Sequence, residues 1–173
     1  MSIAGAISMS GSGSLVVISS SSVDITGVDG LTAANTSSIL VDDSTINLKL
    51  GSSITLYDTT TFVADAGTLN LESGNFTLRG TSAFNLTSLA LFDGKSNAFL
   101  DVYDTSSFSV IGSTMNLGAG SQVTIFNSGK LILDTAGSAT VSGLLVLENN
   151  SGGFVSGSGS NVDLYGSLLL GSV

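Results

Sequence analysis

Two stretches in the middle of the chain decide the fold, because the second nearly repeats the first. Residues 45–62 read TINLKLGSSITLYDTTTF, and residues 68–84 read TLNLESGNFTLRGTSAF. Their first threonines lie 23 residues apart, and both stretches place apolar residues at alternate positions. Such alternation is the pattern of a β-strand with one buried face. The repeat therefore predicts short strands that return with a fixed period.

Apolar–x–apolar triplets recur along the whole chain and fall into three classes. The first class has Asn or Asp at its centre, as in 46–48 (INL) and 69–71 (LNL), and the second has Thr there, as in 54–56 (ITL). A further triplet is assigned to begin at Leu91. The third class places in register Val16, Ile39, Phe62, Phe84, Phe108, Leu131 and Phe154. Each class returns every 22 to 24 residues, which is the signature of a solenoid.

The turns keep the same period as the triplets. Asn, Asp and Gly, which tolerate the left-handed backbone of a sharp corner, follow the triplets at fixed distances. After the Thr class come Asn35, Asp58, Gly80, Asp104, Asn127 and Asn149. After the Asn class come Gly27, Gly51, Gly74, Gly120, Gly143 and Gly166. Proline, which cannot donate to an internal strand ladder, does not occur in the sequence.

These patterns predict an all-β fold, a three-sided parallel β-helix of about seven coils with about 23 residues each. Known short left-handed coils use six-residue steps with a different spacing, so we favour a right-handed coil. We expect one solenoid domain over residues 1–173, without recognisable caps. Parallel strands lie ~4.8 Å apart, so the rod should be roughly 36 Å long. Inward residues should stack on their equivalents, with an aromatic column of Phe62, Phe84, Phe108 and Phe154.

The three triplet classes and the Asn/Asp corner resemble the right-handed parallel β-helix of autotransporter passengers, filamentous-haemagglutinin-type adhesins, pectin-lyase-like proteins and phage tailspikes. The resemblance covers nearly the whole chain and concerns architecture. In pectate lyases such a corner carries an asparagine ladder, so the resemblance implies one here. An intertwined trimeric β-prism of a phage fibre is the alternative fold.

The composition excludes several kinds of chemistry. The sequence contains no Cys and no His, so it offers no disulfide, thiolate or imidazole site. Four basic and 13 acidic residues give a formal charge of −9, which argues against nucleic acid as a partner. The longest apolar runs are far shorter than the ~20 residues of a membrane-spanning helix. The N-terminus lacks Lys and Arg and fits a secretory signal poorly.

Two sets of charged residues should stack along the rod. Asp42 and Asp65 lie 23 residues apart and could form a metal or catalytic pair, although solvated turn residues are the simpler interpretation. Lys49, Glu72 and Lys95 occupy successive coils and are interpreted as a ladder of alternating charge. We predict no catalytic residues and no cofactor, because general acid–base chemistry wants two carboxylates in distinct environments near one bond.

Four side chains that follow the Thr triplets should project outward in a line: Tyr57, Arg79, Tyr103 and Phe126. This lateral ridge could stack on sugar rings or on a neighbouring rod. A self-stacking column that shields the corner is the simpler interpretation and the favoured one.

The two ends of the predicted solenoid should expose unpaired backbone and apolar side chains, since no capping segment is recognisable. The residues concerned are Ile3, Ile7 and Met9 at one end and Leu168, Leu169 and Leu170 at the other. Either the chain is one segment of a longer β-helix, or its ends pair between copies, head to tail, in a filament.

The leading functional expectation is a non-enzymatic structural subunit that stacks end to end into a fibre, outside the cell or on a virion. Its partner would be other copies of itself. The alternative is a surface adhesin or receptor-binding module that uses the lateral ridge on a glycan or cell-surface ligand. Polysaccharide-degrading chemistry of the tailspike type is the weakest of the three.

Overall fold

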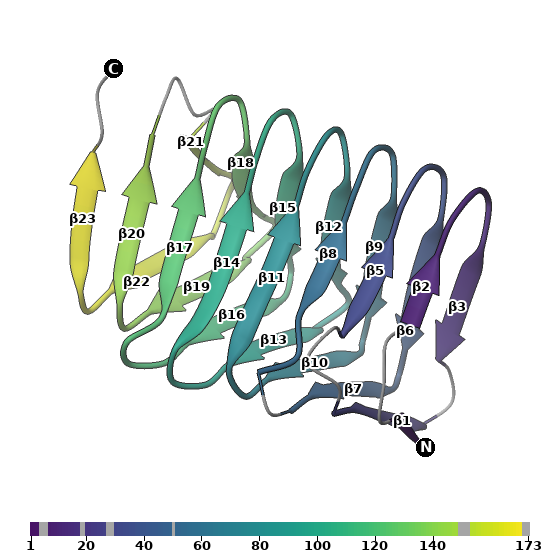
Figure 1. Cartoon of the computed structure of the whole chain (residues 1–173). Helices are drawn as coiled ribbons and strands as arrows, with labels where there is room; N and C mark the ends of the chain where they lie inside the picture. The colour runs from purple at the N-terminus through teal and green to yellow at the C-terminus, as the bar shows by residue number, and fades with distance from the viewer. Residues whose placement is uncertain (4–6, 18–19, 27–29, 50, 149–152, 171–173) are drawn as a thin grey trace.

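The computed structural model describes residues 1–3, 7–17, 20–26, 30–49, 51–148 and 153–170, with the side chains of residues 3 and 153–156 left out. In these residues the chain consists of strands and turns and winds as a three-sided coil around one axis (Figure 1). The 23 strands form three parallel sheets, called here sheets A, B and C, which run the length of the rod.

Sheet A contains β1 (Ser2–Ile3), β4 (Ser22–Ile25), β7 (Thr45–Leu48), β10 (Thr68–Leu71), β13 (Leu91–Gly94), β16 (Thr114–Leu117), β19 (Ser138–Val141) and β22 (Asn161–Leu164). Sheet B contains β2 (Ile7–Met9), β5 (Leu31–Ala33), β8 (Ile54–Leu56), β11 (Gly74–Leu78), β14 (Ala98–Val102), β17 (Gln122–Ile125), β20 (Leu144–Leu147) and β23 (Ser167–Leu170). Sheet C contains β3 (Ser14–Val17), β6 (Ser38–Asp42), β9 (Thr61–Asp65), β12 (Ala83–Thr87), β15 (Ser107–Ile111), β18 (Lys130–Asp134) and β21 (Gly153–Ser156).

Each strand pairs with the equivalent strands of the coils before and after it, except for the edge strands at the two ends of the rod. Ile46 lies beside Leu69 in sheet A, an offset of 23 residues, and Ile54 lies beside Phe76 in sheet B, an offset of 22 residues. The strands β1 to β21 make seven complete coils, and β22 and β23 begin an eighth. The predicted parallel solenoid and its period are therefore confirmed.

The three triplet classes of the sequence correspond to the three sheets. The Asn or Asp class forms sheet A, with Asn47 beside Asn70, and the Thr class forms sheet B, with Thr55 beside Thr77. The third class forms sheet C from Ile39 onward. Position-specific chemistry in the sequence thus gave the strand register.

The predicted register is wrong by one position at two residues, Val16 and Leu91. In sheet C the residue beside Ile39 is Leu15, so Val16 points outward and its side chain is 54% exposed. In sheet A the residue beside Leu69 is Phe92, so the inward position belongs to Phe92 and not to Leu91. A shift of one residue moves a side chain to the other face of a sheet.

The core is a single stack of apolar side chains that fills the coil from end to end. The predicted column is present: the ring centroids of Phe84 lie 4.8 Å from Phe62 and 4.7 Å from Phe108. The side chain of Phe154 lies outside the described residues. Two rings from the other sheets, Phe76 and Phe92, join the column, with centroids 5.6 Å apart. All five described rings are fully buried, which contributes about 1.5–3 kcal/mol for each ring.

The corners between sheets B and C use the left-handed backbone that the sequence predicted. Asn35, Asp58, Gly80, Asp104 and Asn127 have φ values of 62°, 57°, 73°, 59° and 57°, while Asn149 lies outside the described residues. The threonine that follows the first two of these corners donates its hydroxyl to the coil before it: Thr36 Oγ1 to Gly11 O at 3.0 Å and Thr59 Oγ1 to Asn35 O at 2.8 Å. These two corners are therefore tied to the coil before them by a side chain as well as by backbone.

The glycines of the corner between sheets A and B serve two different purposes. Gly51, Gly74 and Gly120 adopt positive φ, as predicted, and Gly27 lies outside the described residues. Gly143 and Gly166 lie outside the left-handed region. A Cβ on Gly143 would meet the carbonyl oxygen of Ser121 at 1.8 Å, so close packing between coils requires glycine there.

Candidate assembly ends and lateral surfaces

The N-terminal end of the rod is formed by the edge strands β1, β2 and β3, each of which pairs with a strand on one side only. The inward residues Ile7, Met9 and Leu15 are half-buried, whereas Leu31 and Ile39, one coil further on, are at most 1% exposed. An apolar hollow of about 420 Å³ lies here, lined by Met1, Leu15, Val16, Val17, Ser21, Ser22 and Val23. This end leaves its apolar interior accessible.

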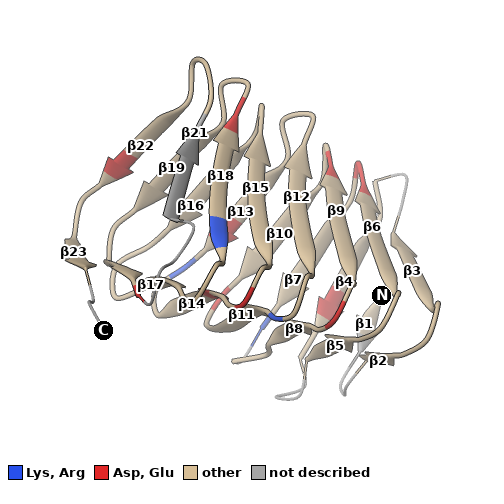
Figure 2. Ribbon diagram, turned by 90° about the horizontal axis from the view of Figure 1, so that it is seen from above, with Lys and Arg blue, Asp and Glu red and all other residues tan. Residues whose placement is uncertain are grey.

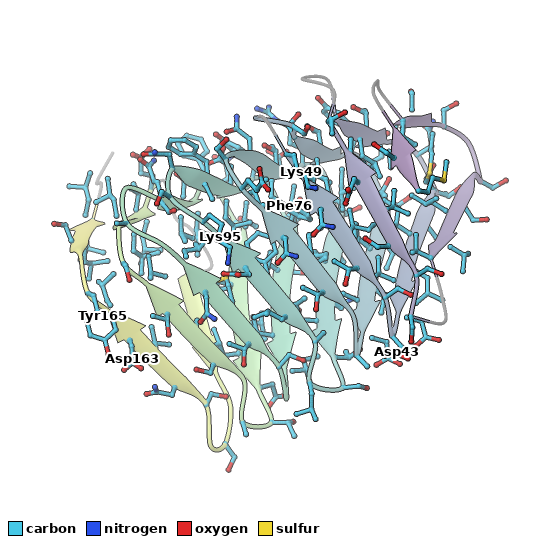
Figure 3. All side chains as sticks on the ribbon, turned by 90° about the horizontal axis from the view of Figure 1, so that it is seen from below. Asp43, Lys49, Phe76, Lys95, Asp163 and Tyr165 are labelled. Atoms are coloured by element: carbon cyan, nitrogen blue, oxygen red, sulfur yellow. The ribbon has the colours of Figure 1, made fainter. Side chains whose placement is uncertain are left out.

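The C-terminal end exposes apolar side chains more strongly. Leu168, Leu169 and Leu170 of β23 are 53%, 51% and 67% exposed. Leu168 lies beside the buried Leu145 of β20, so its exposure comes from the missing coil beyond it. Figure 3 places Tyr165, which is 74% exposed, at this same end of the rod.

Exposed large apolar side chains gather at the two ends. The described residues contain eight, of which Tyr57 and Leu89 belong to the middle coils of the rod. The other six are Met1, Val16, Tyr165, Leu168, Leu169 and Leu170. Of the predicted end residues, Ile7, Met9 and the three leucines are thus located at open ends. Ile3 lies in the edge strand β1, and its side chain is outside the described residues.

The outer face of sheet A carries a ladder of polar side chains. Asn70 Nδ2 donates to Asn47 Oδ1 at 2.7 Å, and Asn47 Nδ2 donates to Asp24 Oδ1 at 2.6 Å. This ladder lies on a sheet face, whereas the ladder that the resemblance implies belongs to the corner between sheets B and C. At the corner between sheets B and C, Asn127 Nδ2 donates to Asp104 Oδ1 at 3.2 Å. These polar side chains therefore satisfy one another by hydrogen bonds between successive coils.

The charged ladder differs in its partners from the one predicted. Lys49, Glu72 and Lys95 do occupy successive coils, because the Glu72 amide donates to Leu48 O and the Lys95 amide donates to Leu71 O. Both lysines nevertheless pair with sheet A aspartates, Lys49 with Asp24 at 3.0 Å and Lys95 with Asp93. The hydrogen bond from Asn47, followed by Lys49, lowers the pKa of Asp24. The lysines lie on the same side of the rod (Figure 3).

The lateral ridge contains a chain of contacts between three of its four predicted members. The guanidinium carbon of Arg79 lies 4.6 Å from the centroid of the Tyr103 ring, and that centroid lies 5.7 Å from the ring of Phe126. Tyr57 begins the row and is 39% exposed. Cation–π and aromatic contacts of this kind contribute about 0.5–1 kcal/mol each at exposed sites. The ridge therefore stacks on itself, and its aromatic residues remain partly exposed.

Sequence reasoning missed the residues beside the ridge on sheet B. Phe99, Asp101 and Tyr103 alternate along β14 and its end, so all three share the outer face. Burial raises the pKa of Asp101, against the lowering effects of a hydrogen bond from Thr124 and of the Arg79 charge. Burial, followed by the Asp101 charge, also raises the pKa of Tyr103. Asp101 stands where the neighbouring triplets of its class have Thr. This departure from the repeat was the signal in the sequence that could have identified these residues.

The predicted acidic pair lies at the corner between sheets C and A. Asp42 and Asp65 are neighbours in the register of β6 and β9, and Figure 2 shows acidic residues at the ends of β6, β9 and β18. Thr87 Oγ1 donates to Asp65 Oδ1 at 2.9 Å, and hydrogen bonds from Ser88 and Thr87 lower the pKa of Asp65. The described residues contain no group of three or more potential metal ligands of the Asp, Glu, His or Cys type.

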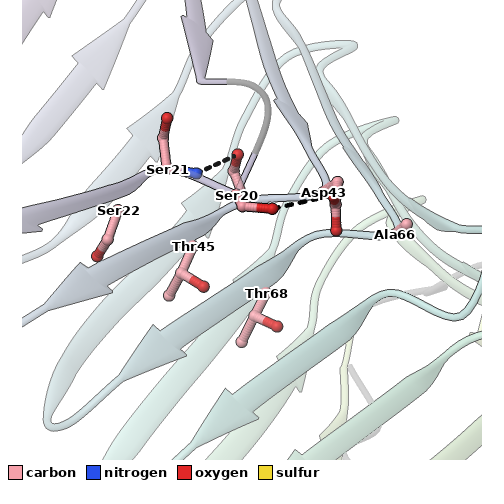
Figure 4. A pocket seen from close by; sticks show the side chains of 8 residues that line it. Ser20, Ser21, Ser22, Asp43, Thr45, Ala66 and Thr68 are labelled. Atoms are coloured by element: carbon pink, nitrogen blue, oxygen red, sulfur yellow. Dashed lines mark hydrogen bonds between the residues drawn. The ribbon is translucent and has the colours of Figure 1, made fainter.

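A shallow polar pocket of about 340 Å³ lies beside this corner (Figure 4). Its lining is mostly hydroxyl groups, from Ser20, Ser21, Ser22, Ser44, Thr45 and Thr68, with Asp43 and Ala66. Ser20 Oγ donates to Asp43 Oδ2 at 3.2 Å, and the Ser21 amide donates to Ser44 Oγ at 3.2 Å. Its polar groups bond to each other across coils, which is a structural role.

Comparison of the chain with protein-family models, with curated proteins and with solved structures finds no match in any of the three. The class of protein is therefore defined by the fold, which is a parallel β-solenoid. In the part of the chain that the structure describes, no helix is long and apolar enough to cross a membrane.

Proposed function

We propose that this protein is a non-enzymatic structural subunit whose copies stack end to end into a fibre. The observation that carries the proposal is the concentration of exposed apolar side chains at the two ends, with Val16 at one and Leu168, Leu169 and Leu170 at the other. Burial of apolar area contributes about 25 cal/mol per Å². Contact between two such ends would remove this area from water.

The backbone supports the same proposal. Both ends present parallel edge strands whose outer N–H and C=O groups have no strand beside them among the described residues. Edge strands of this kind are templates for strand addition. The two ends share one three-sided cross-section, and a head-to-tail contact between them does not close on itself. The product is a filament with the continuous hydrogen-bond ladder of one long solenoid.

Negative-stain microscopy of the purified chain tests the fibre. Wild-type protein should form threads many subunits long, and the double variant Leu169→Lys with Leu170→Lys should give short soluble rods, because buried charge at the junction is costly. The matched control is Leu89→Lys, which alters a leucine that is 87% exposed at a side corner. Threads that persist in the double variant, or short rods from wild-type protein, would contradict the proposal.

A surface module that binds a glycan or a cell-surface ligand is the second candidate function. It is supported by the ridge of Tyr57, Arg79, Tyr103 and Phe126, in which Arg79, Tyr103 and Phe126 contact one another in a row. A glycan array that binds wild-type protein and loses the signal with Tyr103→Ala would favour it. Isolated short rods in the microscope together with such binding would replace the fibre by this function.

We also propose a relationship to particular families of parallel β-helix proteins. The three-sided coil and its Asn and Asp corners support kinship with the autotransporter-passenger, filamentous-haemagglutinin and pectin-lyase-like solenoids. We propose a location outside the cell or on a virion, where a coat of Ser and Thr with only 10% charged residues suits exposure to proteases.

A further inference from the structure

The two ends of the solenoid are stepped, because the chain is one continuous coil. Sheets A and B have eight strands each and sheet C has seven. At the C-terminal end, β23 of sheet B therefore extends one strand beyond β21, the edge of sheet C. At the N-terminal end the coil begins with β1 of sheet A, so the step lies between β1 and β3. The two steps thus lie at different corners of the triangle.

Stacking two copies with equal sheets aligned does not fit these steps. Sheet A would continue from β22 to β1 of the next copy, and sheet B from β23 to β2. Sheet C would lack one strand, because β21 and the next β3 would be separated by about twice the normal strand spacing of ~4.8 Å. Both of these edges would stay unpaired, and the apolar interior would open to water beside them.

Rotation of the next copy about the rod axis by one face of the triangle removes this gap. We propose that each subunit of the fibre is turned by about a third of a revolution relative to the subunit before it, a proposal that rests on the fibre itself. In this arrangement β1 pairs with β21, β2 with β22 and β3 with β23. Every edge strand then gains a partner, and the helical path of the strands continues through the junction without a missing strand.

The lengths of the corners permit the turned arrangement. In the turned stack, the connection of three residues between β1 and β2 lies over a corner that elsewhere has two to four residues.

The side chains support it independently. In the turned stack the outward Val16 of β3 lies beside the outward Leu169 of β23, and these side chains are 54% and 51% exposed in the single subunit. With equal sheets aligned, Leu169 would lie beside Ser8, which is an exposed polar residue. Val16 would lie beside the gap that the missing strand leaves in sheet C. The turned stack therefore covers both exposed apolar side chains with each other.

Cysteine pairs distinguish the two junctions, because the natural sequence contains no Cys. Leu169→Cys with Val16→Cys reports the turned junction, and Leu169→Cys with Ser8→Cys reports the aligned one. Neighbouring strands place these Cα atoms ~4.8 Å apart, within the span of a disulfide. Asp163→Cys with Ser8→Cys reports the turned junction a second time through β22 and β2, and it leaves Val16 and Leu169 intact.

Fibres of each variant would be oxidised and run on a non-reducing gel. We expect a ladder of covalent oligomers from the Leu169–Val16 and Asp163–Ser8 pairs and none from the Leu169–Ser8 pair. Threads that give a ladder only with the Leu169–Ser8 pair would overturn the turned junction and leave the fibre intact. A lack of threads in wild-type protein would overturn both. In threads, helical reconstruction should find a rise of about 37 Å per subunit.

Discussion

The middle coils and the end coils of this rod have nearly the same sequence pattern and very different burial. Along one inward column of sheet B, Leu78 and Val102 are fully buried, Leu147 is half-buried and Leu170 is 67% exposed. The same apolar side chain is thus core or surface according to its position along the axis. In a solenoid each coil is covered only by its neighbours, so the first and last described coils are covered on one side only.

The largest expected effect contrasts a core ring with an end leucine. Phe84→Ala should lower the free energy of unfolding by about 3–5 kcal/mol, because it leaves a cavity among the stacked rings. Leu168→Ala, at a position that is 53% exposed, should cost under about 1 kcal/mol in unassembled protein. Urea unfolding in the Leu169→Lys/Leu170→Lys background measures both. Equal costs would show that the ends are as well packed as the middle.

A smaller effect is expected from the glycines of the two regions. Gly143→Ala places a Cβ 1.8 Å from the Ser121 carbonyl oxygen and should cost about 1–3 kcal/mol through overpacking between coils. Gly13→Ala near the N-terminal end meets its nearest atom at 3.5 Å, so a change within about 0.5 kcal/mol is expected. Thermal melting of both variants provides the measurement. A neutral Gly143→Ala would mean that adjacent coils can separate at low cost.

The smallest effect is a pair of opposite dependences on pH. The pKa of Asp101 is raised above the ordinary value of 3.8 by burial. Its contribution to stability is therefore complete below the unfolded-state pKa and is lost as pH rises through the folded-state pKa. Asp101→Asn should accordingly raise the melting temperature at neutral pH, since the amide needs no charge.

Asp24, nearer the N-terminal end, provides the control with the opposite sign. Its pKa is lowered, first by Asn47 and then by Lys49, so its stabilising contribution is present above 3.8, the ordinary value, and is lost as pH falls through the folded-state pKa. Asp24→Asn should lower the melting temperature slightly at neutral pH. Melting curves between about pH 3 and pH 7 compare the two. The same sign of change in both variants would contradict the assignment of causes.

The sequence predicted the fold well because each sheet has its own repeated chemistry. Asn at the centre of sheet A triplets and Thr at the centre of sheet B triplets gave the register of both sheets. Prediction failed where several apolar residues adjoin. Residues 15–17 read LVV and residues 91–92 read LF, and either alternation of such a run can point inward. The neighbouring strand chose Leu15 and Phe92.

The candidate surfaces were only partly predictable. The end residues and the ridge follow from the period, but the association of Phe99 and Asp101 with the ridge was missed because Asp101 departs from the Thr that its class repeats at the outward position. The partners of Lys49 and Lys95 were also missed. Long side chains can reach residues in their own or the neighbouring coil, and a spacing of 23 residues does not say which.

The sequence by itself determined that this chain winds as repeated three-stranded coils, because strands that stack on equivalent strands must repeat their apolar and corner residues at one period. Only the tertiary structure decided which apolar side chains remain uncovered and where the coil stops relative to its own three faces. Burial and strand pairing depend on the coils above and below, and a local pattern holds no information on whether such a coil is there.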